Sequence, residues 1–242
     1  MKYIVFILFL STMILFAEED WTAQQIIQKS INISSPVSMA SYSKQTIYFS
    51  NGRQRTFEIQ TYTKDKNNKS LMIYKKPARV KGDKFLFLKG GDIWVYFSKT
   101  GRVRRIASSA KKSKMQGSNF SYEDMSLMTS LNTDYTTKFI KPKNKQYVIE
   151  LHPKNTSVSY NKLIAYVDKK TFVLYKLEFY KKDKLVKFLT QSKYKKIQDY
   201  RIPFLITMQN IRGDSKTVIE TEQVKINPKI SDSLFNKNNL EQ

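Results

Sequence analysis

The chain has 242 residues, of which 43 are Lys or Arg and 20 are Asp or Glu, so its formal net charge at pH 7 is +23. It has no cysteine and one histidine, which excludes disulfides, thiolate metal sites and a cysteine nucleophile and argues against a zinc centre. The length fits one medium-sized domain.

Residues 1–17 have the organisation of a secretory signal peptide. A lysine precedes an apolar run from Ile4 to Phe16, and Ala17 stands before three acidic residues. The apolar run is shorter than the about 20 residues that span a bilayer. We therefore predict cleavage after Ala17 and an exported mature domain of residues 18–242. An uncleaved N-terminal anchor is the alternative.

The basic charge raises nucleic-acid binding first, but export argues against that partner. The basic residues are spread along the chain, in the segments 64–66, 102–105, 111–114, 181–184 and 193–196. Two interpretations remain for them: solvated outer faces of strands, or attraction to an anionic membrane surface.

The first half of the mature chain predicts a helix followed by an antiparallel meander. Apolar residues at helical spacing indicate a helix from Thr22 to Ile33, with Pro36 beyond its end. The period then changes to two, and Asn51-Gly52 is a strong hairpin signal. The expected strands are 42–49, 53–62, 71–74, 84–88, 92–97 and 103–107.

A second helix, expected from Ser121 to Leu131, separates this meander from a second run of strands. Before that helix, residues 108–119 are polar and basic and show no periodicity. The later strands are expected at 146–151, 163–168, 173–180, 185–194, 201–209 and 217–226.

Many strands of similar length with polar outer positions predict one strongly curved sheet, closed or half-closed, rather than two domains. The strands are aromatic on both parities, as the run Trp94 to Phe97 illustrates. A sheet wrapped round an apolar cavity would need this surplus, and an ordinary sandwich core with exposed tyrosines would show it too. The pattern leaves open which parity faces inward.

The residues offer little for catalysis. His152 is the sole histidine and stands beside Pro153 at a strand end, where exposure explains it better than a role as base. Acidic residues form no calcium-binding run, and Gly90-Gly91 is a turn signal rather than a phosphate-binding loop. We therefore predict no enzymatic activity, no catalytic residue, no metal and no cofactor.

Residues 114–125 stand out from this pattern. Gly117-Ser118-Asn119 predicts a turn, and Ser121 with Asp124 three residues later predicts an acidic variant of the capping box at the start of the second helix. Met115, Met125 and Met128 suit either core filling or a surface that adapts to variable apolar shapes.

With this segment the chain resembles the outer-membrane lipoprotein-sorting proteins, the LolA-like periplasmic carriers. The resemblance rests on Trp94-Val95-Tyr96, the Arg104-Arg105 pair and the segment Gly117 to Asp124. It continues in order through Leu177 to Tyr180, Leu185-Val186-Lys187, Tyr194, Ile202-Pro203 and Thr207 to Asn210. It covers nearly the whole mature chain, and the combination is more specific than any single piece.

The resemblance implies a mainly β (α+β) fold: a curved, incomplete antiparallel barrel of about 11 strands, with helices as a lid over an apolar cavity. The residues that it implies for the cavity or its mouth are Phe85, Phe87, Trp94, Tyr96, Phe120, Tyr122, Met125 and Met128. The residues assigned to lid or partner contact are Arg53, Arg55, Arg104 and Arg105, of which the first two rest on position alone.

The function that the resemblance implies is carriage, in the periplasm, of acylated lipoproteins or other lipids from the inner towards the outer membrane. Loading by an inner-membrane transporter of the ABC or RND type, peripheral contact with anionic membrane and a monomeric state accompany this expectation. The alternative is a non-enzymatic periplasmic adaptor of such a transporter, which would bind protein alone. Cargo, transporter and acceptor stay open.

Overall fold

The computed structural model describes residues 21–143, 145–155, 158–213 and 215–241, without the side chains of Met128, Thr129 and residues 141–143. The predicted signal peptide and its cleavage site lie outside these residues. Within the described ranges, no helix has the length and apolar character needed to cross a membrane.

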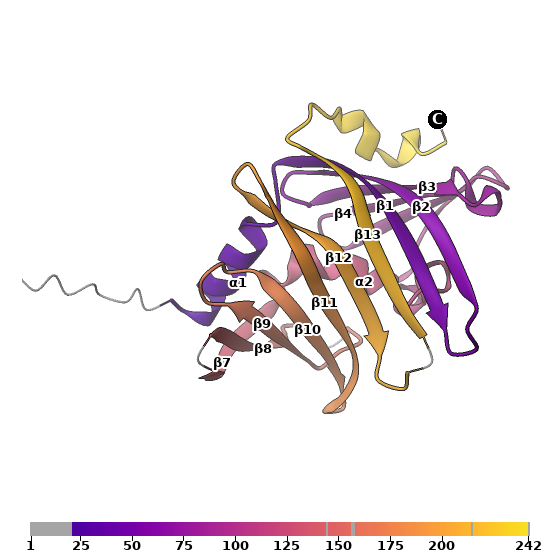
Figure 1. Cartoon of the computed structure of the whole chain (residues 1–242). Helices are drawn as coiled ribbons and strands as arrows, with labels where there is room; N and C mark the ends of the chain where they lie inside the picture. The colour runs from indigo at the N-terminus through magenta and orange to yellow at the C-terminus, as the bar shows by residue number, and fades with distance from the viewer. Residues whose placement is uncertain (1–20, 144, 156–157, 214, 242) are drawn as a thin grey trace, which may run out of the picture.

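One antiparallel sheet forms the molecule (Figure 1). Its strands lie in the order β6-β5-β4-β3-β2-β1-β13-β12-β11-β10-β9-β8-β7. Their bounds are β1 Ser38–Phe49, β2 Gln54–Lys64, β3 Lys69–Lys76, β4 Lys84–Leu88, β5 Asp92–Phe97, β6 Arg102–Arg105, β7 Tyr135–Lys143, β8 Gln146–Pro153, β9 Lys162–Asp168, β10 Leu174–Lys181, β11 Lys184–Ile197, β12 Tyr200–Asn210 and β13 Ser215–Ile226.

The sheet is strongly curved and stays open, because β6 and β7 form its two edges. This confirms the expected incomplete antiparallel barrel. The 13 strands exceed the expected number of about 11. Sequence analysis missed β7 (Tyr135–Lys143), where threonines and lysines hide the apolar alternation.

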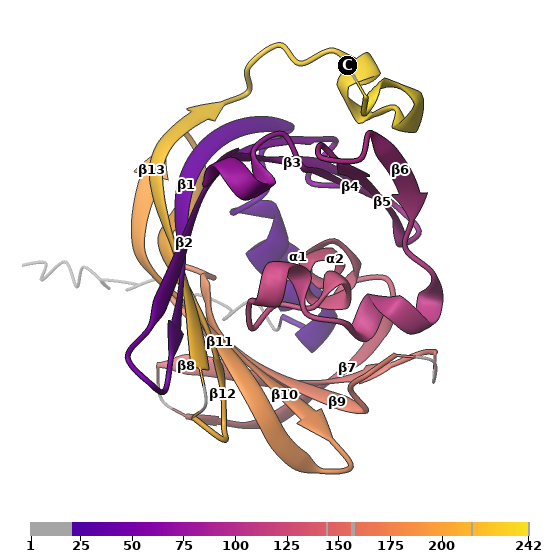
Figure 2. The same ribbon diagram turned by 90° about the vertical axis from the view of Figure 1, so that its right-hand side faces the viewer.

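Both expected helices form and lie inside the curve of the sheet (Figure 2). Helix α1 (Ala23–Asn32) begins with a capping box between Thr22 and Gln25 and buries Ile26 and Ile27. Helix α2 (Tyr122–Ser130) begins with the predicted capping box between Ser121 and Asp124. The 3-10 helices are η1 Ala78–Val80, η2 Ser108–Lys112, η3 Met115–Gly117, η4 Asp232–Phe235 and η5 Lys237–Asn239.

Two apolar clusters hold the helices on the concave side. The β7–β12 cluster takes in α1 and Leu127 of α2, and also includes Ile26, Phe120, Leu163 and Phe179. The β1–β5 cluster includes Phe57, Tyr74, Phe85, Val95 and Met115. Met125 of α2 packs against both clusters, so this helix joins the two halves of the sheet.

The C-terminal segment, residues 228–241, packs on the convex face of the sheet over β2 to β6. Phe235 and Leu240 form a third cluster with Leu71 of β3 and Leu86 of β4. Leu86 lies between Phe85 and Phe87 of the β1–β5 cluster, so the two sets occupy opposite faces. Figure 2 shows this segment outside the curve, beside β3 to β6. The two helices, by contrast, lie on the concave side.

Candidate functional site

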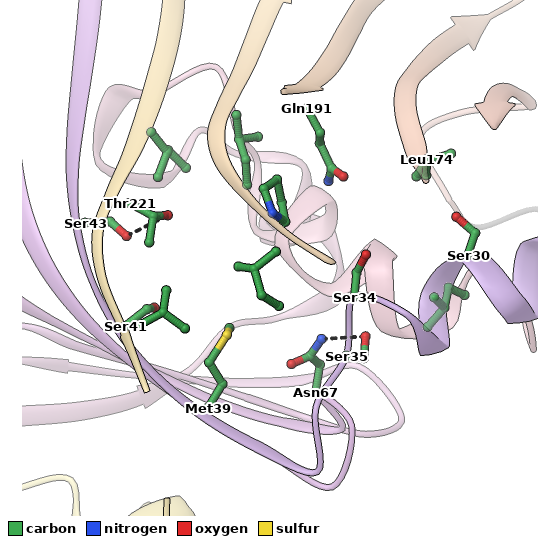
Figure 3. A pocket seen from close by; sticks show the side chains of 16 residues that line it. Ser30, Ser34, Ser35, Met39, Ser41, Ser43, Asn67, Leu174, Gln191 and Thr221 are labelled. Atoms are coloured by element: carbon green, nitrogen blue, oxygen red, sulfur yellow. Dashed lines mark hydrogen bonds between the residues drawn. The ribbon is translucent and has the colours of Figure 1, made fainter. Parts of the chain in front are cut away.

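A pocket of about 220 Å³ lies between α1 and the concave side of the sheet (Figure 3). The C-terminal end of α1 forms one wall, and β1, β13, β12, β11 and β10 form the other. Its apolar lining includes Ile31, Met39, Leu174, Ile206, Ile219 and Val224. Such a lining suits the hydrocarbon part of a ligand.

Hydroxyl and amide groups from both walls also line this pocket, among them Ser30, Ser41, Thr221 and Gln191 (Figure 3). The Asn67 amide donates to Ser35 Oγ at 2.9 Å, while Asn67 Oδ1 and Ser30 Oγ are buried with no hydrogen-bond partner among the described residues. A buried polar atom without a partner costs about 1–3 kcal/mol. These two atoms are therefore ready to bond a ligand's polar group or a water.

Helix α2 is fixed to the sheet by a buried ion pair. The Lys187 ammonium, on β11, bonds Asp124 Oδ2, and the two side chains are 9% and 1% exposed. Asp124 also accepts from the Ser121 amide at 2.6 Å and from the Tyr160 hydroxyl at 3.0 Å. Burial, and then the Asp124 charge, raise the pKa of Tyr160, so its hydroxyl stays a donor. One carboxylate thus caps the helix and ties it to β11.

The turn before α2 is tied to a second strand. Asn119 is 3% exposed, and its backbone N–H donates to Thr217 Oγ1 at 2.9 Å. The Thr217 hydroxyl donates in return to Asn119 Oδ1 at 2.8 Å, and Asn119 Nδ2 donates to Ser215 Oγ at 2.9 Å. The lid segment, defined here as residues 108–131, is therefore anchored to β13 as well as β11.

Several residues assigned to the cavity do lie on the concave side. Phe85 and Phe87 belong to the β1–β5 cluster, and Phe120 belongs to the β7–β12 cluster. Tyr122 and Met125 are half-buried and pack against the β1–β5 cluster. The side chain of Met128 lies outside the described residues. None of the five described residues lines the pocket beside α1.

The assignment of Trp94 and Tyr96 to the cavity was wrong. Both side chains pack in the outer cluster, and the Lys237 ammonium lies 4.6 Å from the Trp94 ring centroid. Their neighbours Ile93 and Val95 point to the concave side instead. Because the C-terminal segment covers the outer face, both parities of β5 are apolar, and alternation could not tell them apart.

The four arginines assigned to lid or partner contact lie in different places. A Cβ added to Gly117 would lie 3.3 Å from Arg55 Nη1, so Arg55 is beside the lid segment. Arg53 is exposed at the β1–β2 turn, and Arg104 lies on the edge strand β6. Arg105 lies on the convex face, opposite Trp94, and forms an ion pair with Asp92. The guanidinium lowers the pKa of Asp92. Contact with a partner stays a prediction for all four.

Sequence analysis missed Lys187, Asn119, Thr217 and Tyr160 as anchors of the lid segment. One signal was present: Lys187 shares its strand parity with Leu189, which is buried in the concave core. A lysine at an inward position needs a buried partner, since an unpaired buried charge is costly.

Three solved structures share this fold. A putative outer membrane lipoprotein-sorting protein domain from Vibrio parahaemolyticus matches with 23% identity and a TM-score of 0.82, over 91% of this chain and 98% of that one. A DUF1329 family protein from Desulfovibrio piger ATCC 29098 matches with 25% identity and a TM-score of 0.81, over 90% of this chain and 97% of that one. A LolA superfamily protein from Nitrosomonas europaea matches with 22% identity and a TM-score of 0.76, over 90% of this chain and 99% of that one. No curated protein matches the chain.

Residues 66–242 match a family model described as "Uncharacterized protein". The match covers more than half of the chain. The chain therefore belongs to that family, and its fold is the one seen in the lipoprotein-sorting protein domain and the LolA superfamily protein above.

Proposed function

We propose that the protein is a periplasmic carrier that binds acyl chains of lipoproteins or other lipids and moves them from the inner towards the outer membrane. The observation that carries the proposal is the open, curved sheet, whose apolar concave side lies under two helices and keeps a pocket beside α1. The role is non-enzymatic, and an inner-membrane ABC or RND-type transporter would load the carrier.

Energetics explains why such cargo needs a carrier. Each buried methylene contributes about 0.8 kcal/mol, so a sixteen-carbon chain is held in a membrane by on the order of 10 kcal/mol. A protein that accepts this chain must offer comparable apolar surface. The source of such surface would be the concave side, where the two inner clusters are aliphatic and aromatic and the pocket adds six or more aliphatic side chains to its polar ones.

The pocket as it stands is small for a whole acyl chain. Its about 220 Å³ lies below the roughly 300–1,000 Å³ of ordinary small-molecule sites. Entry therefore requires α1 to move away from the sheet. The end of α1 is held by part-buried bonds, from the Arg201 amide to Ile33 O at 2.7 Å and from Ser34 Oγ to Arg201 O at 3.0 Å. Helix α2 is fixed by the buried Lys187–Asp124 pair.

The test is uptake of a fluorescent fatty acid by the purified mature protein. Ile206, which lines the pocket, is replaced by Asp, and the matched control is Leu205→Asp on the opposite parity of β12. We expect Ile206→Asp to weaken binding by about tenfold or more, while the control binds as wild type. Ile206→Thr serves if the aspartate variant does not fold. Equal binding by the two aspartate variants would contradict the proposal.

A second candidate, an adaptor that binds a transporter subunit alone, is favoured by one observation. The inner clusters fill much of the concave side with the protein's own side chains. Native mass spectrometry with lipid extraction, on protein purified gently from periplasm, separates the two. An added mass that resolves into acylated lipid or lipoprotein supports the carrier, and a bare polypeptide that takes up no fatty acid supports the adaptor.

A further inference from the structure

A second pocket, of about 250 Å³, lies where η1 meets the β5–β6 turn. Its lining is dominated by four cations, Arg79, Lys99, Arg102 and Arg104, together with Asp83 and Phe97. It shares no lining residue with the pocket beside α1. A ligand in this pocket would therefore bind independently of an acyl chain in the pocket beside α1.

Strand pairing directs the two β6 arginines into this corner. Arg102 pairs with Phe97 and Arg104 with Val95, and directly opposed residues of an antiparallel pair share a face. Val95 and Phe97 pack with the β1–β5 cluster, so both arginines lie on the concave side at the free edge of the sheet. Figure 2 shows this edge at β5 and β6.

Arg79 approaches the pocket from η1. Its guanidinium carbon lies 5.3 Å from the Phe57 ring centroid, and Phe57 belongs to the β1–β5 cluster. Contact with the face of a ring uses none of the guanidinium N–H donors, so they stay free to bond an anion. Contact with Phe57 thus holds Arg79 at the wall of the pocket, whose one aromatic lining residue is Phe97.

The cations have no carboxylate partner within the described part of the chain. None of the four forms an ion pair there. The one carboxylate in the lining, Asp83, is 5% exposed and already bonded. Its Oδ1 accepts from the Ser98 amide and hydroxyl, both at 2.9 Å, and its Oδ2 accepts from Gln116 Nε2 at 3.3 Å. Four cations in one concavity therefore face a single, engaged acid.

We propose that this basic pocket, lined by Arg79, Lys99, Arg102 and Arg104, binds a phosphate group. Guanidinium forks match phosphate oxygens in paired hydrogen bonds, and charge-assisted bonds of this kind are about twice as strong as neutral ones. Two sources share this chemistry: the headgroup of an amphiphile whose chains lie along the neighbouring apolar cluster, and a free phosphate ion.

The experiment titrates the mature protein with three probes by calorimetry: inorganic phosphate, monomeric dihexanoyl phosphatidic acid and dihexanoyl phosphatidylcholine. The variant is Arg102→Gln with Arg104→Gln. The matched control, Lys225→Gln with Lys229→Gln, removes the same charge from exposed positions elsewhere. We expect phosphatidic acid to bind and the arginine variant to weaken it by about tenfold or more, while the control leaves it unchanged.

The outcomes separate the sources. Phosphatidic acid binding well above inorganic phosphate supports a lipid headgroup, and equal binding of the two supports a free phosphate ion. Phosphatidylcholine carries a singly charged phosphodiester beside a quaternary ammonium, so it should bind more weakly than phosphatidic acid. The proposal is overturned if the arginine variant weakens phosphatidic acid binding no more than the control does, or if no probe binds. Fatty-acid uptake is measured separately, so failure of the carrier proposal leaves this result intact, and the reverse holds too.

Discussion

Lys187 and Asp124 are the residues on which the position of the lid segment depends most directly. Replacing Lys187 by Met keeps the bulk of the side chain but leaves the Asp124 carboxylate buried without its cation. Breaking a buried pair from one side costs about 3–5 kcal/mol. We expect the free energy of unfolding of Lys187→Met, measured by urea denaturation, to fall by about that amount.

The control for this substitution is Lys184→Met, at the exposed start of the same strand. It removes one charge without touching a buried partner, so it should change stability by less than about 0.5 kcal/mol. The double variant Lys187→Met with Asp124→Asn should recover part of the loss, since an asparagine is neutral and can still accept from the helix N-terminus. Equal stability of the two single variants would refute the anchoring role of the pair.

The C-terminal segment covers the convex face of β5, where Trp94 and Tyr96 lie. Asp232 accepts from Lys64 and Lys69 at 2.8 Å each, and these bonds lower the pKa of Asp232 to about 2. Because this pKa is below the unfolded value of about 3.9, the contribution is present above pH 4 or so and is lost as the pH falls towards 2.

The corresponding prediction uses Trp94 as a reporter in a Trp21→Phe background, since the chain has two tryptophans. Asp232→Asn should loosen the C-terminal segment at neutral pH, shift the Trp94 emission to the red and raise its quenching by acrylamide. The wild type should show the same change only on acidification or in high salt, which screens an exposed pair. Asp183→Asn, at another exposed lysine pair, is the control. An unchanged Trp94 emission in Asp232→Asn would count against the tether.

The helices and strands also differ in how well the sequence alone predicted them. Helix α2 was predicted because Ser121 and Asp124 form its cap locally, and most strands were predicted from alternation. The sequence did not predict which side chains of β5 point to the concave side. Trp94 is covered on the convex face by residues about 140 positions further along the chain, such as Leu234. The Lys187–Asp124 pair joins residues 63 positions apart. Contacts of this range leave no periodic signal in a single sequence.

The whole molecule carries a net charge of +23, and part of this charge lies on the lid segment. Lys112 and Lys114 are exposed and Lys111 is half-buried there. Each basic residue near an anionic membrane contributes about 1 kcal/mol of attraction, which falls off within a Debye length of about 10 Å at 0.1 M salt. A carrier that meets membranes through its lid segment should therefore bind anionic vesicles in a salt-dependent way.

Charge reversal tests which part of the molecule faces the membrane. The variant Lys111→Glu, Lys112→Glu, Lys114→Glu should bind phosphatidylglycerol vesicles about a hundredfold more weakly than wild type in low-salt co-sedimentation. The control reverses Lys181, Lys182 and Lys184, all exposed at the β10–β11 turn, and so makes the same change in net charge. If the lid segment faces the membrane, the control keeps most of its affinity, because it leaves the three lid lysines in place. An equal loss in both variants would show that net charge alone attracts the protein and that the lid segment has no special part in it.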